Sequence, residues 1–467
     1  MIDSFPFRAR AAAATALLTL AMAGCGSLPR ISPDLARADP GSVQFQAANG
    51  RILSPERSRA LIDKLAGSGE KTDVLARHLA VEQAVAETPL TLGNRVVILE
   101  DGPATYAAML AAIASARDHI NMETYILEDD EAGQQFASVL MEKQAEGVQV
   151  NLIYDSVGSL GTKKEFFKRL ADVGIQVVEF NPVNPLAAKG NWEPNQRDHR
   201  KLLVVDGKSA ILGGINISSV YSGGSSGRGS GGGDRKSRLP WRDTDLLIEG
   251  PVVASLQELF IETWQKQKGP PLGSRQYLPA LQQRGSEVVR AIGGDPDEPF
   301  SQIYVTLISA INSAETEILL TNAYFVPDPQ LLETLIRAVA RGVDVKLILP
   351  STTDSGLVFH AGRSHYELLL RGGVKLYERR GALLHAKTAL IDGVWATVGS
   401  TNLDWRSFLH NQELNAVVLG AEFGEKMRAA FDRDLAASDP IMLAAWRQRS
   451  VATRAKEMFA RLWEYWL

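Results

Sequence analysis

The chain has 467 residues, roughly three times the usual size of one domain, so at least two domains are expected. Its 45% hydrophobic and 22% charged residues are typical of a globular protein with a large core. The 50 Lys and Arg residues are balanced by 54 Asp and Glu residues, and the formal charge of −4 disfavours a dedicated nucleic-acid binder. The single cysteine excludes an internal disulfide scaffold, and the lack of any apolar run of about 18 residues excludes a polytopic membrane protein.

Residues 1–25 predict a secretory signal. Arg8 and Arg10 precede the apolar run AAAATALLTLAMAG, and Cys25 follows this run directly. The order resembles a bacterial lipoprotein signal, which implies that Cys25 is lipidated and becomes the first residue of the mature chain. The alternative is an uncleaved signal anchor with an incidental cysteine. Both interpretations predict a body that is tethered to a membrane outside the cytoplasm. Residues 26–90 then predict a helical and linker region without recognisable chemistry.

The rest of the chain is a duplication. Each half repeats an amphipathic helix followed by a β-rich strand, in residues 108–127, 137–155 and 167–180 and again in 306–326, 331–350 and 366–379. Glycines 147, 174, 342 and 373 end helices before strands. Strands that alternate with helices indicate α/β layers around a mostly parallel sheet. We therefore expect one domain over residues 91–270 and a second over residues 271–440.

Each half ends in the same motif. In the first half it is His199-x-Lys201 with Asp206 five residues later, followed by Gly-Gly-x-Asn216. In the second half the motif comprises His385, Lys387, Asp392 and, after Gly-Ser-x, Asn402. All four residue types recur at one constant offset, a register that chance does not plausibly produce.

These paired motifs resemble the signature of the phospholipase D superfamily, H-x-K-x4-D followed by G-[GS]-x-N, and the resemblance covers about residues 95–435. The segments 384–407 and 242–251 are most similar to those of bacterial cardiolipin synthases. The resemblance implies two tandem α/β sandwich domains that are related by a pseudo-two-fold axis and share one active site.

The motif residues suit phosphodiester chemistry. Residues two apart on a strand point to the same side, so each His–Lys pair presents one imidazole and one ammonium to a common surface. Two such pairs would supply cationic donors for the phosphate, a nucleophile and an acid. Asn216 and Asn402 would add amide donors to the phosphate. No metal or other cofactor is needed, and no cluster of metal-ligand spacing is evident in the sequence. Related enzymes often use the first-half histidine as nucleophile, which implies His199 in that role and His385 as acid and then base.

Four acidic residues are assigned to supporting roles. Asp206 and Asp392 each precede a glycine between apolar β-rich runs, so we predict hairpin turns that support the motifs, with proton transfer as the alternative. Asp243 and Glu413 occupy corresponding positions downstream. In the superfamily an acidic residue at this position orients the catalytic histidine, so the resemblance implies that role for both.

Two further segments carry predictions. The insertion 222–239 is mostly Gly and Ser with several basic residues and predicts a flexible loop, either an inert linker or a mobile lid that contacts anionic lipid. Residues 441–467 predict a basic amphipathic helix, which either docks on the body or lies in a membrane interface. One face of this helix would carry Val451, Ala455, Met458, Leu462, Trp463 and Trp466. The resemblance favours the membrane.

The resemblance implies a phosphatidyltransferase that makes cardiolipin through a phosphohistidine, with phospholipids and a membrane surface as partners and without nucleic acid. Hydrolytic phospholipase D activity is the principal alternative, because the chemistry is identical until water or an alcohol enters. An endonuclease is disfavoured by the acidic balance, and a binding protein without activity is disfavoured because both motifs are complete. The phosphatidyl donor and the oligomeric state stay open.

Overall fold

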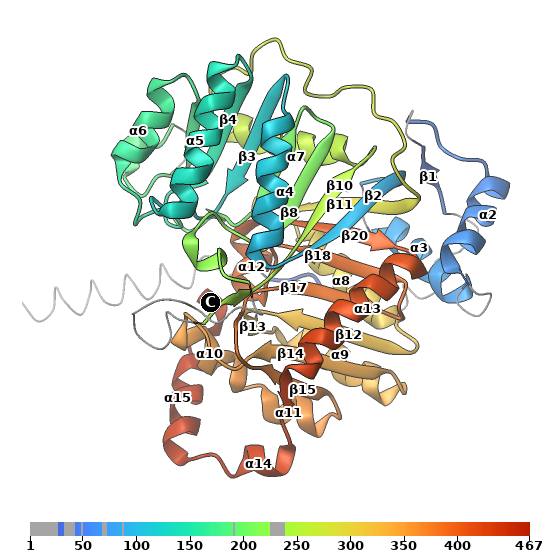
Figure 1. The fold of residues 1–467 in the computed structure, drawn as a ribbon. Coiled ribbons are helices and arrows are strands. Elements are labelled where there is room, and N and C mark those ends of the chain that lie inside the picture. Colours follow the sequence, from blue (N-terminus) through green and yellow to red (C-terminus); the bar gives the residue numbers. More distant parts are fainter. Residues whose placement is uncertain are drawn as a thin grey trace, which may run out of the picture.

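The computed structural model describes residues 27–31, 43–47, 50–67, 72–85, 88–189, 192–224 and 239–467. The predicted signal with Cys25, and most of the Gly/Ser insertion, therefore lie outside the described residues. The chain forms two similar halves, with the first half at the top of Figure 1 and the second half below it.

The first half is built on a mixed sheet with helices on both faces. The strand order is β5, β4, β3, β7, β8, β10, β2. Helices α4 (Asp101–Ser115), α5 (Glu131–Ala145) and α6 (Lys164–Asp172) cover one face, and α7 (Val253–Lys266) packs on the other. The strands are β2 (Leu90–Glu100), β3 (His119–Thr124), β4 (Gln149–Asp155), β5 (Gln176–Phe180), β7 (Leu202–Val205), β8 (Ser209–Gly213) and β10 (Thr244–Glu249).

The second half repeats this plan. Its strand order is β15, β14, β12, β17, β18, β20, β11, which corresponds strand by strand to the first half. Helices α8 (Gln302–Ser313), α9 (Pro329–Ala340) and α11 (Tyr366–Arg371) cover the outer face, and α13 (Ala421–Ala436) covers the inner face. The strands are β11 (Glu287–Gly294), β12 (Glu317–Asn322), β14 (Asp344–Pro350), β15 (Lys375–Arg379), β17 (Lys387–Ile391), β18 (Trp395–Gly399) and β20 (Asn411–Leu419). The predicted pair of α/β sandwich domains is confirmed.

The expectation of a mostly parallel sheet is wrong. Among the described strands in the two orders given above, β3, β4 and β5 run parallel to one another, as do β12, β14 and β15 in the second half. The remaining neighbours within each sheet are antiparallel. The short Asp-Gly turns at Asp206 and Asp392 account for one antiparallel pair in each half, β7 with β8 and β17 with β18, because a turn of two or three residues joins only antiparallel strands.

The two halves bury each other's inner faces. Strands β2 and β11 pair antiparallel and join the two sheets. Between the sheets lies one hydrophobic cluster that includes Leu202 and Phe260 of the first half and Leu390 and Phe431 of the second. Separating the halves would expose this apolar surface to water, which is unfavourable. The halves therefore hold a fixed position relative to each other, as a shared site requires.

The region before residue 90 serves the second half, although it precedes the first. Strand β1 (Phe45–Gln46) pairs with β2, and α3 (Thr72–Val85) packs against α8. Phe45 and Leu75 lie in the outer core of the second half together with Ile308. Helix α2 (Pro55–Ala66) completes this N-terminal layer.

The C-terminal region is not one helix over residues 441–467, contrary to expectation. It forms β21 (Ser438–Pro440), α14 (Leu443–Arg447), α15 (Val451–Arg461) and the 3-10 turn η6 (Glu464–Trp466). The break has a local cause, because the hydroxyl of Ser450 accepts a hydrogen bond from Thr453 N and starts a new helix there. In the part of the chain that the structure describes, no helix has the length and apolar character needed to span a bilayer.

Candidate active site

The two motif histidines lie at equivalent strand breaks. His199 lies between β6 (Arg197–Asp198) and β7, and His385 lies between β16 (Leu383–Leu384) and β17. The short strand before each histidine pairs with a strand of the other half of the chain. Strand β6 pairs with the start of β20, and β16 pairs with β9 (Trp241–Arg242). The backbone N–H of His199 donates to Gln412 O at 2.9 Å, and that of His385 donates to Arg242 O at 2.7 Å.

Because of this strand pairing, each histidine contacts a carboxylate that belongs to the opposite half. Nδ1 of His199 lies 3.0 Å from both carboxylate oxygens of Glu413, in the second half. Nδ1 of His385 lies 2.7 Å from Oδ2 of Asp243, in the first half. A carboxylate can only accept, so Nδ1 donates in both pairs and Nε2 is the ring nitrogen left for chemistry.

Both imidazoles are held neutral by their surroundings. Burial lowers the pKa of His199 to about 4, with Lys201 lowering it further and Glu413 acting against the shift. Burial and Lys387 likewise lower the pKa of His385, whereas Asp243 raises it. Glu413 stays ionised, because His199 and Lys201 outweigh the effect of its burial and lower its pKa. A neutral imidazole that is oriented by a carboxylate is the form that can attack phosphorus.

The two motif lysines belong to the same buried cluster. Nζ of Lys201 donates to His199 O at 2.5 Å, and Nζ of Lys387 donates to His385 O at 2.5 Å. Burial, together with the nearby Lys387 ammonium, lowers the pKa of Lys201 to about 7. The pKa of Lys387 is lowered by its burial as well. An arriving anionic phosphodiester would favour the protonated form of both lysines, so the pair can supply two cationic donors to the phosphate.

Asp206 and Asp392 lie at the far ends of the motif strands, away from the histidines. Asp206 accepts hydrogen bonds from the backbone N–H groups of residues 117–119, at 2.8 to 3.1 Å. Asp392 accepts from those of residues 315–317 at 2.7 to 3.2 Å and contacts His78 of α3 at 2.9 Å. Both aspartates have a left-handed φ of 53° in the hairpin turn. The predicted hairpins are confirmed, and both side chains tie a turn to the start of a neighbouring strand.

The two motif asparagines differ in their surroundings. Asn216 is fully engaged, because its Oδ1 accepts from Ile126 N at 3.1 Å and its Nδ2 donates to the Tyr221 hydroxyl at 3.1 Å. That hydroxyl lies 3.4 Å from Nδ1 of His385. Asn402 is buried, and its Oδ1 has no partner among the described residues. That oxygen can only accept a hydrogen bond, so its free capacity suits a hydroxyl or ammonium donor and not the oxygens of a phosphate.

The small residues of the motifs make room for the carboxylates. A Cβ atom at Gly214 would collide with the carboxylate of Asp243. At the equivalent position of the second motif, the Ser400 hydroxyl donates to Oε2 of Glu413 at 2.5 Å. The Gly or Ser at the second position of the G-[GS]-x-N pattern is thus explained by its contact with the carboxylate that orients the opposite histidine.

Aromatic side chains around the imidazoles were missed by the sequence analysis. The Tyr125 ring meets His199 edge-on at 5.1 Å, and the Lys201 ammonium lies 5.1 Å from the Tyr125 ring centre. Trp241 and Tyr324 lie 5.2 and 6.3 Å from the His385 ring. The sequence contained a signal for them, since Tyr125 and Tyr324 both come just after the second strand of their half, β3 and β12.

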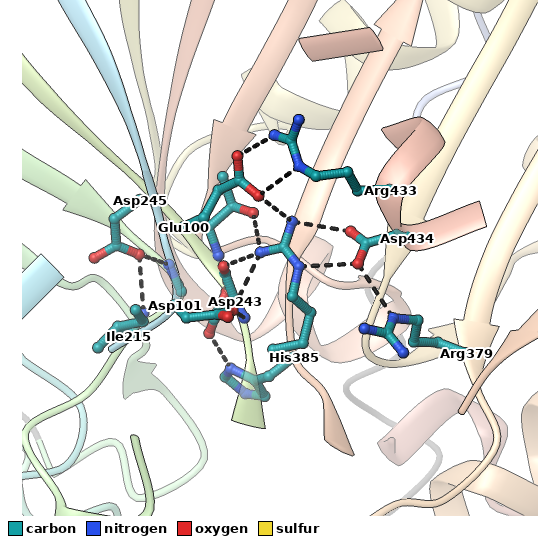
Figure 2. Close-up of polar contacts among 12 residues, drawn as sticks. Glu100, Asp101, Ile215, Asp243, Asp245, Arg379, His385, Arg433 and Asp434 are labelled. Atoms are coloured by element: carbon teal, nitrogen blue, oxygen red, sulfur yellow. Dashed lines mark hydrogen bonds and ion pairs between the residues drawn. The ribbon is translucent and has the colours of Figure 1, made fainter. Parts of the chain in front are cut away.

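A buried network of ion pairs contacts the backbone of Asp243 and its neighbour Arg242 (Figure 2). Arg242 donates to Asp434 through Nε at 2.9 Å and also contacts Asp101. Asp434 in turn accepts from Arg379 at 3.2 Å, and Asp101 accepts from Asp243 N at 3.2 Å. These contacts limit the movement of Asp243 and therefore of His385.

Comparison with known proteins identifies the family. The family profile described as "Cardiolipin synthase, PLD-like domain" matches residues 109–221 and 307–435. The chain belongs to the phospholipase D superfamily. It is 35% identical to a cardiolipin synthase of Geobacillus thermodenitrificans over 82% of this chain and 74% of that protein. It is 34% identical to a cardiolipin synthase of Alkalihalophilus pseudofirmus, over 90% of this chain and 79% of that protein.

The solved structures agree on the fold. A phosphatidylserine synthase from Haemophilus influenzae superposes with a TM-score of 0.60 over 83% of this chain and 99% of that one, at 14% identity. The chain is an enzyme of the superfamily's phosphatidyltransferase type. No group of three or more metal-ligating side chains occurs among the residues that the structure describes.

Proposed function

We propose that this enzyme transfers a phosphatidyl group to the glycerol hydroxyl of phosphatidylglycerol and so forms cardiolipin. The carrying observation is the reciprocal pair of imidazoles, each held through Nδ1 by a carboxylate of the other half. The similarity to cardiolipin synthases over most of the chain supports this choice of substrate.

In the first proposed step Nε2 of His199 attacks the phosphorus of the donor lipid. The bond from phosphorus to the headgroup oxygen breaks, and His385, protonated at Nε2, gives its proton to that oxygen. The arriving phosphodiester favours the protonated form of His385, because its negative charge opposes the effects that lower the pKa of this imidazole. Lys201 and Lys387 stabilise the charge that develops on the non-bridging oxygens.

In the second step the phosphohistidine is consumed. The hydroxyl of the acceptor attacks phosphorus, its proton passes to Nε2 of His385, and the phosphorus–nitrogen bond to His199 breaks. Both groups thereby return to their starting forms. With water in place of the alcohol the product is phosphatidic acid, so the acceptor alone separates transfer from hydrolysis.

Product analysis tests the proposal. The purified enzyme is incubated with phosphatidylglycerol, alone or with phosphatidylethanolamine, and the lipids are analysed by mass spectrometry. Cardiolipin that is absent with the double variant His199→Ala/His385→Ala supports transfer. Phosphatidic acid as the sole product assigns hydrolysis instead, and cleavage of added DNA without lipid turnover assigns a nuclease.

We also propose that the enzyme is anchored to a membrane outside the cytoplasm through a lipid on Cys25. Support comes from the sequence pattern of residues 8–25. Labelling of cells with a radioactive fatty acid tests this. Label that disappears in Cys25→Ser is expected, and a protein without label contradicts the lipid anchor.

A further inference from the structure

Helix α15 exposes large apolar side chains to solvent and buries a glutamate against the protein. The side that faces the protein carries Glu457 and Ala460, which are 2% and 1% exposed, whereas Met458 and Leu462 are 73% and 78% exposed. A helix on the surface of a soluble protein normally turns its apolar side inward. Here the inner side contacts α10 (Gly356–Arg363) and the outer side is apolar. We name this outer side, together with the turn that follows the helix, the C-terminal apolar surface; it comprises Val451, Met458 and Phe459 of α15 and Leu462, Trp463 and Trp466 after it.

Positive charge predominates around this surface. Arg454, Lys456 and Arg461 are exposed. Glu457 is buried against Arg449 at 2.9 Å, and the Glu464 carboxylate, 28% exposed, contacts His365 at 3.1 Å and Arg461 at 3.6 Å. Apolar side chains with tryptophans, flanked by the exposed cations Arg454 and Lys456 and with both nearby carboxylates paired to basic side chains, match the interface of an anionic bilayer.

The surface is connected to the catalytic cluster. Arg406, which follows Asn402 by four residues, donates its backbone N–H to Leu467 O at 3.1 Å. The Trp466 ring lies parallel to that of His410, and His410 O accepts from Arg197 N at 3.2 Å, two residues before His199. A bilayer on this surface would therefore lie beside the strand that carries His199.

The start of the described chain reaches the same side. Residues 27–31 line a cavity together with Trp405 and Tyr465. Gln330 holds this segment, because Ile31 N donates to its Oε1 at 3.0 Å and its Nε2 donates to Pro29 O at 3.1 Å. Ser27 follows the predicted lipidation position, Cys25, by two residues. Residues 27–31 therefore lie beside Tyr465, the neighbour of Trp466 in the C-terminal apolar surface.

We propose that the C-terminal apolar surface inserts into the interface of an anionic phospholipid bilayer and holds the catalytic cluster against its substrate. The proposal rests on the proposed lipid substrate for its purpose, but binding is measurable without turnover. Peptide-resolved hydrogen exchange of the full chain separates this surface from any anchor at the N-terminus. Vesicles of phosphatidylglycerol and phosphatidylcholine should slow exchange in the peptide 451–463, and phosphatidylcholine alone should do so much less.

Matched substitutions sharpen the test. Leu462→Asp should raise the vesicle concentration for half-maximal protection by at least about tenfold, since an apolar side chain that is 78% exposed in the free protein loses its burial in lipid. Leu278→Asp is the control, because Leu278 is also exposed, at 49%. Its neighbour Tyr277 packs on His119, at the end of β3 that lies away from Tyr125 and the catalytic cluster. The double variant Arg454→Gln/Lys456→Gln should weaken binding about tenfold on anionic vesicles and little on neutral ones.

Turnover separates the surface from the chemistry. Leu462→Asp should turn over a soluble short-chain diester at the normal rate and vesicle lipid at a reduced rate. Equal losses on both substrates, or no vesicle-dependent protection of the peptide, would overturn the proposal. Protection that follows protein concentration without vesicles, with a dimer in sedimentation, would assign the surface to a second copy and overturn it too. Protection by vesicles in a chain that lacks transferase activity would leave the surface proposal standing and reject the proposed function.

Discussion

Both carboxylate oxygens of Glu413 lie 3.0 Å from Nδ1 of His199, although 214 positions of sequence separate the two residues. The reciprocal contact, from Asp243 to His385, spans 142 positions in the other direction. Each motif histidine therefore takes its carboxylate partner from the opposite half of the chain. The active unit is the pair of halves, and a change in either carboxylate is expected to act on the histidine of the opposite half.

Replacing either histidine should abolish turnover. If His199 and His385 serve one phosphorus atom, each single Ala variant loses nearly all activity and the double variant loses little more, because both act in one unit. Turnover of a soluble diester is measured, with circular dichroism as the control for folding. Lys201→Met and Lys387→Met should each reduce turnover by on the order of 10²-fold. Substantial turnover by a folded His variant would contradict the shared site.

The covalent intermediate should form on His199. With a diester whose leaving group needs no proton, His385→Asn should accumulate phosphorus on His199, because the acceptor can no longer be activated. Mass spectrometry of peptides from quenched reactions locates the label, and His199→Asn should trap none. Label on His385 would reverse the two roles.

The crossed carboxylates should affect different steps. Glu413→Gln removes the partner of His199 and should slow formation of the phosphoenzyme, whereas Asp243→Asn removes the partner of His385 and should slow its breakdown. Losses of on the order of 10² to 10⁴ are expected for an imidazole that is held in the wrong tautomer. Rapid-quench kinetics with the same diester separates the two steps. The opposite assignment of steps would contradict the crossed pairing.

Stability should depend on pH through His199. Its pKa is about 4 in the folded chain because of burial and about 6.5 when unfolded, so between these values the unfolded state binds the extra proton. The free energy of unfolding should therefore fall as the pH drops from 6.5 to 4. His199→Asn should remove up to about 3 kcal/mol of this dependence. Urea unfolding of both proteins across this range is the measurement, and parallel curves would argue against a buried neutral imidazole.

Removal of metal ions should leave the chemistry intact. Lys201 and Lys387 supply the positive charge that an ion would otherwise provide, so exhaustive chelation should not change turnover of a soluble diester. A soluble substrate avoids effects of ions on lipid headgroups. Activity that is lost with chelator and restored by one specific ion would refute this prediction.

The duplication, both motifs and the superfamily could be recognised from the sequence, because they depend on local patterns of residues. The position of Asp206 and Asp392 in hairpins also follows from local chemistry, since an Asp-Gly pair favours the left-handed backbone that both turns adopt. The sequence likewise placed Asp243 and Glu413 at equivalent positions, but it did not assign either carboxylate to a histidine.

The assignment was decided by tertiary structure, because it depends on β6 pairing with β20 and β16 pairing with β9 across the halves. The same holds for the mixed sheets, whose strand directions depend on which strands become neighbours, and for α15, whose apolar stripe faces outward. Periodicity shows that a helix has two different sides, but the partner of each side is chosen by long-range packing. Glu457 lies on the inner side of α15 because it forms an ion pair there with Arg449.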